Sequence, residues 1–195
     1  SDCFTALIWQ SLCSCIFDIS SVELIKYISP ANLWLNYIVL IAYYIFFNAM
    51  PLMFYLCFWF LSEKNRKMPL KQYWIMFGLY LFFSLFTITS PFTHLVFWFD
   101  SNLVLQHGPF FYVYYLLDIL YVGGGLLHFF RHHKQFTSTQ IFSLMFFTTA
   151  CFVAAMLQTV FPYLLITGFV FSLTILILFL SLENPDDYIV QDGVV

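Results

Sequence analysis

The longest uncharged stretch of the chain constrains its fold more than any other feature. Residues 135–182 form a run of 48 residues without Asp, Glu, Lys or Arg. As one helix this run would be about 72 Å long, against roughly 30 Å for the hydrocarbon core of a bilayer. The run must therefore fold back at least once. Residues 31–62 and 72–99 are two further uncharged stretches of membrane-spanning length.

The composition excludes a water-soluble globule. Hydrophobic residues make up 62% of the chain and charged residues only 9%, which leaves too few polar side chains to cover a soluble protein of 195 residues. A transmembrane barrel needs short segments that alternate apolar and polar side chains, whereas these segments are apolar on every face. We therefore predict an all-α, polytopic transmembrane helix bundle in contact with the lipid bilayer. The small net charge of -3 gives no support for nucleic-acid binding.

Turn signals divide the chain into about six predicted spans. Pro30, Pro91 and Pro162 mark three of the breaks, because proline disfavours helix in the residue before it. Residues 94–108 read as an aromatic loop or interfacial segment. Residues 1–182 then form the bundle, and residues 183–195 form an acidic juxtamembrane tail. The predicted spans are residues 4–21, 33–61, 72–89, 110–130, 137–158 and 163–182.

The basic residues predict the orientation, because cytoplasmic loops carry the excess of Lys and Arg. With the second and fourth loops inside, only Lys26 lies on the outer side. The sequence thus predicts a multi-pass protein of the inner (plasma) membrane with a cytoplasmic C-terminus. The six basic residues placed inside are Lys64, Arg66, Lys67, Lys71, Arg131 and Lys134.

Two carboxylates and one amide fall inside predicted spans. Asp18 and Asp118 would cost roughly 2.5–3.5 kcal/mol or more at membrane depth unless they face the bundle interior, so both are candidate ligand-binding residues. The alternative is that Asp118 is a hydrogen-bonded tether between helices and that Asp18 lies near the headgroups. Asn48 precedes Pro51, which interrupts helical hydrogen bonding and kinks the helix. This pattern is typical of a cavity or of a plain packing kink.

The loop of residues 94–108 gathers His94, Trp98, Asp100 and His107 among several aromatic residues. These side chains are candidates for binding a small ligand or a lipid headgroup at the mouth of the bundle. The alternative is an aromatic belt at the membrane interface with two solvated histidines. Both interpretations stay open from the sequence alone.

No residue pattern indicates catalysis, a cofactor or a metal. No nucleophile, phosphate-binding or zinc-protease motif occurs, so this chain is not predicted to be an enzyme. His128 and His132 are four residues apart, a spacing that can bind a metal, but no third ligand lies nearby in sequence and the basic loop accounts for them. The five cysteines are predicted to be buried small hydrophobes without a disulfide framework. Gly123, Gly124 and Gly125 predict close packing of a neighbouring helix.

Several short motifs occur in a recognisable order. They resemble the N-terminal seven-helix membrane regions that precede GGDEF domains in diguanylate cyclases of clostridial and related bacteria, which are also similar to the seven-helix sensors of some histidine kinases. The resemblance covers nearly the whole chain. Its motifs are CIFDISSV at 15–22, WLNY at 34–37, NAMP at 48–51, ITSP at 88–91, FWFD at 97–100, GP at 108–109, Gln158 before FP at 161–162, and LSLENPD at 180–186.

The resemblance implies a sensory input module of a bacterial signal-transduction protein. In that family a further helix precedes the first one seen here, and a cyclase domain follows the segment like residues 182–188, which here continues differently. The signal would be an unknown small ligand from outside or within the membrane, and a homodimer formed through the helices is left open. The alternative function is a small transporter or proton-coupled carrier, suggested by Asp18, Asp118 and the interrupted second helix.

Overall fold

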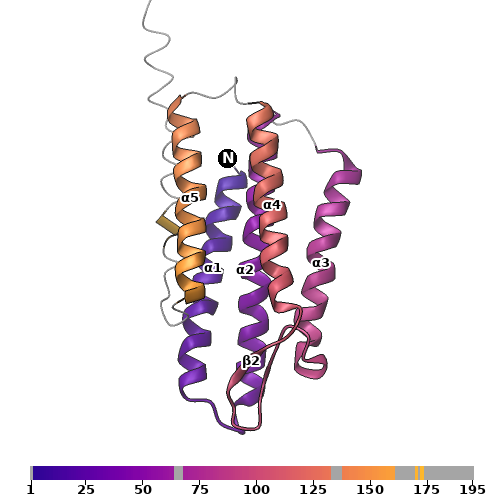
Figure 1. Cartoon of the computed structure of the whole chain (residues 1–195), viewed down its shortest axis with the longest axis vertical. Helices are drawn as coiled ribbons and strands as arrows, with labels where there is room; N and C mark the ends of the chain where they lie inside the picture. Colours follow the sequence, from indigo (N-terminus) through magenta and orange to yellow (C-terminus); the bar gives the residue numbers. More distant parts are fainter. Residues whose placement is uncertain (1, 64–67, 133–137, 161–169, 171, 174–195) are drawn as a thin grey trace, which may run out of the picture.

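The computed structural model of the chain is an elongated bundle of long helices with one small β-hairpin (Figure 1). The structure describes residues 2–63, 68–132, 138–160, 170 and 172–173. The helices are α1 (Asp2–Lys26), α2 (Leu33–Ser62), α3 (Leu70–Thr93), α4 (Phe111–Arg131) and α5 (Ser138–Val160), and the strands are β1 (Phe97–Phe99) and β2 (Leu105–His107).

Four helices of the described chain, α1 to α4, are long and apolar enough to cross a membrane. This confirms the mostly helical fold and gives four candidate membrane spans rather than the six predicted. In α5 the apolar part is shorter, residues 144–154. The sixth predicted span, residues 163–182, lies almost entirely outside the described residues, as does the tail at 183–195.

The predicted end of the third span at Thr89, with a break at Ser90 and Pro91, is wrong, because α3 continues through Pro91 to Thr93. A proline this close to a helix end removes little of the helical hydrogen bonding. The helix ends at His94, which adopts a left-handed conformation with φ of 56° and donates its N–H to the Ser90 carbonyl at 2.8 Å. That backbone conformation reverses the chain into the hairpin.

Helix α1 is polar inward and apolar outward, the reverse of a helix on a soluble protein. Its buried face carries Ser11, Ser14, Asp18 and Ser21. Its exposed face carries Trp9, Leu12, Ile16 and Ile19, among others. Small polar residues allow close helix approach inside a membrane, while exposed apolar side chains fit lipid. The pattern therefore supports contact between this helix and a bilayer.

Helix α2 is the centre of the bundle and packs against α1, α3 and α4. A Cβ added at Gly125 would lie 2.7 Å from the Phe58 ring, and one at Gly124 would lie 3.4 Å from the Tyr55 ring. Both aromatic residues belong to α2. The predicted close packing at the glycine triplet is thus confirmed for Gly124 and Gly125, while Gly123 faces open space.

Side-chain hydrogen bonds from two tyrosines and one glutamine join neighbouring helices within the candidate spans. Tyr80 of α3 donates to the Ile45 carbonyl of α2 at 3.1 Å, and Tyr121 of α4 donates to the Met76 carbonyl of α3 at 2.7 Å. Gln10 of α1 donates to the carbonyl of Phe46 at 2.6 Å. Two of these bonds thus reach carbonyls of α2 in the turns before Pro51, and they join α1 and α3 to this part of the helix.

The cysteines do not all behave as predicted. Cys13 and Cys15 are free, but Cys57 of α2 is disulfide-bonded. The prediction of unpaired buried thiols is wrong for Cys57, because spacing along the sequence does not show which thiols helix packing brings together.

Candidate functional site

The predicted aromatic loop contains an antiparallel β-hairpin closed by Asp100. Phe97 pairs with His107 and Phe99 with Leu105. One Asp100 carboxylate oxygen accepts the backbone N–H of Asn102 at 2.8 Å and that of Val104 at 2.9 Å. Its other oxygen accepts the Gln106 side-chain amide at 3.2 Å. The backbone bonds from Val104 and Asn102 and this amide hold the pKa of Asp100 below its ordinary value. Asp100 therefore stabilises the turn.

The two histidines of this region stack on aromatic rings. The His94 ring lies 5.4 Å from that of Trp98, and the His107 ring lies 3.9 Å from that of Phe111. The shielding of His107 from water lowers its pKa, since loss of hydration disfavours the charged imidazolium. Both histidines are exposed in the structure.

Ser90 fixes the hairpin to α3 from a fully buried position. Its hydroxyl donates to the Phe97 carbonyl at 2.7 Å and accepts the N–H groups of Phe97 and Val96 at 2.8 and 3.1 Å. One side chain thus satisfies three backbone groups of Val96 and Phe97, both of which are fully buried.

Helices α2 and α4 hold the hairpin from its other sides. The Tyr37 hydroxyl of α2 accepts the Phe99 N–H at 3.1 Å. Gly108 and Phe110, just before α4, donate their N–H groups to the carbonyls of Val96 and Leu95 at 2.7 and 2.9 Å. Gly108 packs so closely that an added Cβ would lie 2.2 Å from the Leu95 oxygen. The hairpin is therefore joined to three helices.

An aromatic layer fills the space between the hairpin and the helices. The Phe97 ring is buried and stacks on Tyr44 at 5.1 Å and on Tyr37 at 6.1 Å. Tyr44 in turn stacks on Tyr114 of α4 at 6.3 Å. A movement of the hairpin would therefore press directly on rings from α2 and α4.

The intramembrane candidates lie apart from the hairpin. Asp18 is buried on the polar face of α1, and Asp118 is half-buried on α4, seven residues or roughly 10 Å along the helix from its start. Asn48 of α2 is buried, and its side-chain nitrogen has no hydrogen-bond partner in the described part of the chain. The structure thus groups His94, Trp98, Asp100 and His107 at one end and leaves Asp18, Asn48 and Asp118 within the helices.

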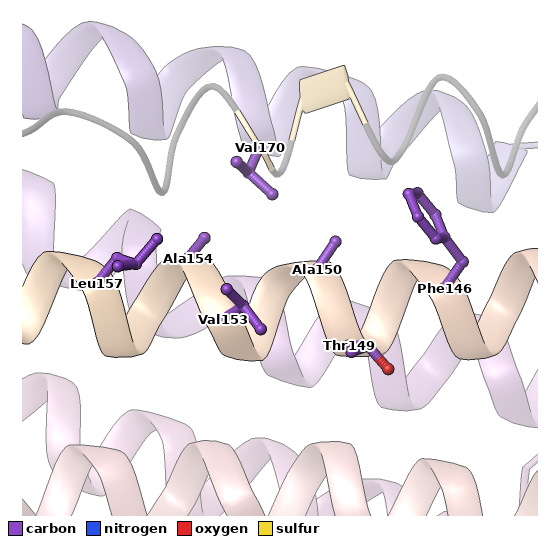
Figure 2. Close-up of a pocket in the computed structure, with 7 residues that line it drawn as sticks. All are labelled: Phe146, Thr149, Ala150, Val153, Ala154, Leu157 and Val170. Carbon is purple, nitrogen blue, oxygen red and sulfur yellow. The ribbon is translucent and has the colours of Figure 1, made fainter.

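One hollow in the described part of the chain lies between α5 and Val170, with a volume of about 320 Å³. Figure 2 shows Phe146, Ala150 and Ala154 pointing toward Val170, while the Thr149 hydroxyl points away. Val153 and Leu157 complete the lining. This apolar hollow includes none of the predicted site residues.

At the opposite end of the bundle from the hairpin, helix packing brings together a cluster that the sequence did not predict. Glu63, which follows α2, lies beside His128 and His132 at the end of α4. The histidine spacing is visible in the sequence, but Glu63 is distant along the chain and only the packing of α2 on α4 supplies it.

Comparison with known proteins finds no matching protein-family model, curated protein or solved structure.

Proposed function

We propose that the chain is the membrane-embedded input module of a signal-transduction protein. A ligand from outside the cell or from the membrane acts on the hairpin end, and the helices pass the change to a cytoplasmic effector such as a diguanylate cyclase. The observation that carries the proposal is the attachment of one small hairpin to α2, α3 and α4 through Tyr37, Ser90 and the backbone around Gly108.

This attachment suits signal transmission because packed helices move as rigid units. A change in hairpin position displaces the ends of three helices at once, and small shifts of packed helices reach their far ends. At that far end lie the C-termini of α2 and α4 and the N-terminus of α3 (Figure 1).

The distribution of basic residues supports transmission from the hairpin end to a cytoplasmic opposite end. Lys26 near the hairpin end is paired with Glu23 at 2.6 Å, whereas Lys71 and Arg131 lie exposed at the other end. An excess of basic residues marks the cytoplasmic side. Around the hairpin, Trp34 and Phe92 are exposed and their rings lie 5.8 Å apart, which fits an aromatic belt at the outer interface.

A reporter fusion tests the proposal. The chain is joined to an active diguanylate cyclase domain, and cyclic di-GMP is measured in cells with and without candidate ligands. We expect His94→Ala and Asp118→Asn to change the output, while the exposed lipid-facing substitution Ile119→Leu leaves it unchanged. If no substitution and no candidate ligand changes the cyclic di-GMP level, the proposal is contradicted.

A second candidate function, a small transporter, is favoured by one observation. Within the described ranges the buried Asn48 side-chain nitrogen has no partner, and it lies three residues before Pro51. Carriers with broken helices bind their substrates beside such interruptions. Uptake into proteoliposomes tests this function. Flux that is lost in Asn48→Leu and Asp18→Asn would favour it, and absence of flux for every candidate substrate would argue against it.

A further inference from the structure

The cluster at the far end of α2 and α4 has the composition of a metal site. Glu63 caps the end of α2, His128 lies in the last turn of α4 and His132 caps that helix. One oxygen of Glu63 lies 3.5 Å from the Nε2 atom of His128 and 3.5 Å from the Nε2 atom of His132. The atoms offered by the three residues all lie within 4.8 Å of one another.

These distances are too long for direct hydrogen bonds, which join N and O at about 2.7–3.2 Å. They match instead the spacing of ligands around a shared ion. Zinc binds nitrogen and oxygen at about 2.0–2.2 Å, so two ligands of a tetrahedral site lie roughly 3.4 Å apart. The gap between Glu63 and each histidine thus corresponds to one edge of such a tetrahedron.

The hydrogen bonds of the two histidines leave the Nε2 atom of each one available as a metal ligand. Among the residues that the structure describes, the buried Nε2 atom of His128 has no hydrogen-bond partner. The Nδ1 atom of His132 lies 3.0 Å from the His128 carbonyl, so it carries the proton and donates it there. That bond leaves the Nε2 lone pair of His132 directed to the cluster, which is the usual arrangement of a metal-bound histidine.

The surrounding side chains hold this geometry. The His128 ring stacks on Trp59 of α2 at 4.0 Å with an angle of 18°, which fixes the ring plane. His132 is only partly exposed, and the side chain of Glu63 is 22% exposed. Arg131 lies between the histidines in sequence and repels a cation, but it is exposed to water, and the Glu63 carboxylate offsets its charge.

We propose that Glu63, His128 and His132 bind a divalent transition-metal ion, with Zn²⁺ as the preferred ion. Two imidazoles and one carboxylate are a known zinc ligand set that leaves a fourth position for water. The ion joins the last turn of α2 to the last turn of α4 and so fixes the relative position of these two ends. This inference concerns binding alone and does not depend on the proposed signalling function.

The test is titration of the purified full chain in nanodiscs with Zn²⁺, followed by calorimetry, after the free thiols have been blocked with N-ethylmaleimide. We expect one ion per chain with micromolar or tighter affinity, no competition from Mg²⁺, and the visible absorption of tetrahedral Co²⁺ when that ion replaces zinc. The isosteric Glu63→Gln and the substitution His132→Ala should each weaken binding by roughly tenfold or more.

Matched controls come from the other end of the bundle. His94→Ala and His107→Ala remove histidines that also stack on aromatic rings, and they should leave zinc affinity unchanged. Circular dichroism and size-exclusion chromatography check that each variant is folded; Glu63→Gln keeps the shape of the side chain, so it remains informative if a histidine variant fails. Failure of the folded chain to bind Zn²⁺, or binding that Glu63→Gln and His132→Ala leave intact, would overturn the proposal.

Discussion

The Tyr37 hydroxyl of α2 accepts a hydrogen bond from the Phe99 N–H of β1 at 3.1 Å, across 62 positions of sequence. Both residues are buried, so no water replaces the bond when it is broken. The bond is a direct polar link between the hairpin and the central helix of the bundle, so a substitution at Tyr37 tests the role of the hairpin.

Tyr37→Phe removes this link while keeping the aromatic ring. A buried N–H left without a partner costs about 1–3 kcal/mol, so we expect the free energy of unfolding to fall by that amount. Unfolding of the solubilised chain by SDS titration measures the change. Tyr112→Phe, at a tyrosine that is 73% exposed on α4, is the matched control and should have no measurable effect.

Gly108→Ala tests the close approach of the hairpin to the start of α4. The added Cβ would lie 2.2 Å from one backbone oxygen and 2.4 Å from another, so the backbone must move. We expect a loss of about 1–3 kcal/mol or more in the same titration. Gly78→Ala on α3 adds its Cβ in open space and should be neutral or slightly stabilising. Equal effects of the two substitutions would contradict the observed packing.

The Asp100 turn should weaken in acid. Hydrogen bonds to the carboxylate hold the pKa of Asp100 below its unfolded value, so the turn is stabilised above that value and loses this stabilisation as the pH falls through the lower, folded pKa. Amide hydrogen exchange, corrected for the intrinsic pH dependence, should show declining protection of Asn102 and Val104 below about pH 4. In Asp100→Asn the protection should be lower and no longer respond to acid.

A larger side chain on the buried polar face of α1 should destabilise the bundle. Ser14→Leu inserts a large side chain at a position that is 5% exposed, and we expect it to destabilise the bundle by about 1–3 kcal/mol. Ala6→Leu places the same side chain on the exposed face of α1, where it meets lipid. Thermal unfolding in nanodiscs should therefore separate the two variants. Similar melting temperatures would mean that the serine face is not packed in the interior.

The ends of α1 to α4 were predicted to within five residues, the largest difference being at the end of α1, which runs to Lys26 rather than Ser21. Uncharged windows and flanking turn residues are local signals that a sequence shows directly. The β-hairpin could not be predicted from the sequence. Its strands are only three residues long, and its geometry depends on Ser90 binding backbone groups six and seven residues away and on the left-handed His94. Pro91, a local break signal, lies in the last turn of α3, where a proline removes little of the helical hydrogen bonding.

The candidate site residues could likewise be predicted only in part from the sequence. Composition and depth identified Asp18 and Asp118 as residues inside spans, and the structure places them on α1 and α4. The turn-closing role of Asp100 depends on backbone donors that a sequence does not reveal. Glu63 joins His128 and His132 only because α2 and α4 end at the same level, a relation between distant segments that residue spacing does not encode.

The most direct test of the account is the position of the two ends of the bundle relative to the membrane. Asn102→Cys in the hairpin turn and Lys71→Cys at the start of α3 are exposed positions at opposite ends. Each is labelled in intact cells with a membrane-impermeant maleimide, with the unsubstituted chain as background. We predict that Asn102→Cys is labelled from outside and Lys71→Cys only after the membrane is permeabilised. Labelling of both from the same side would contradict a bundle that links an outer hairpin to a cytoplasmic end.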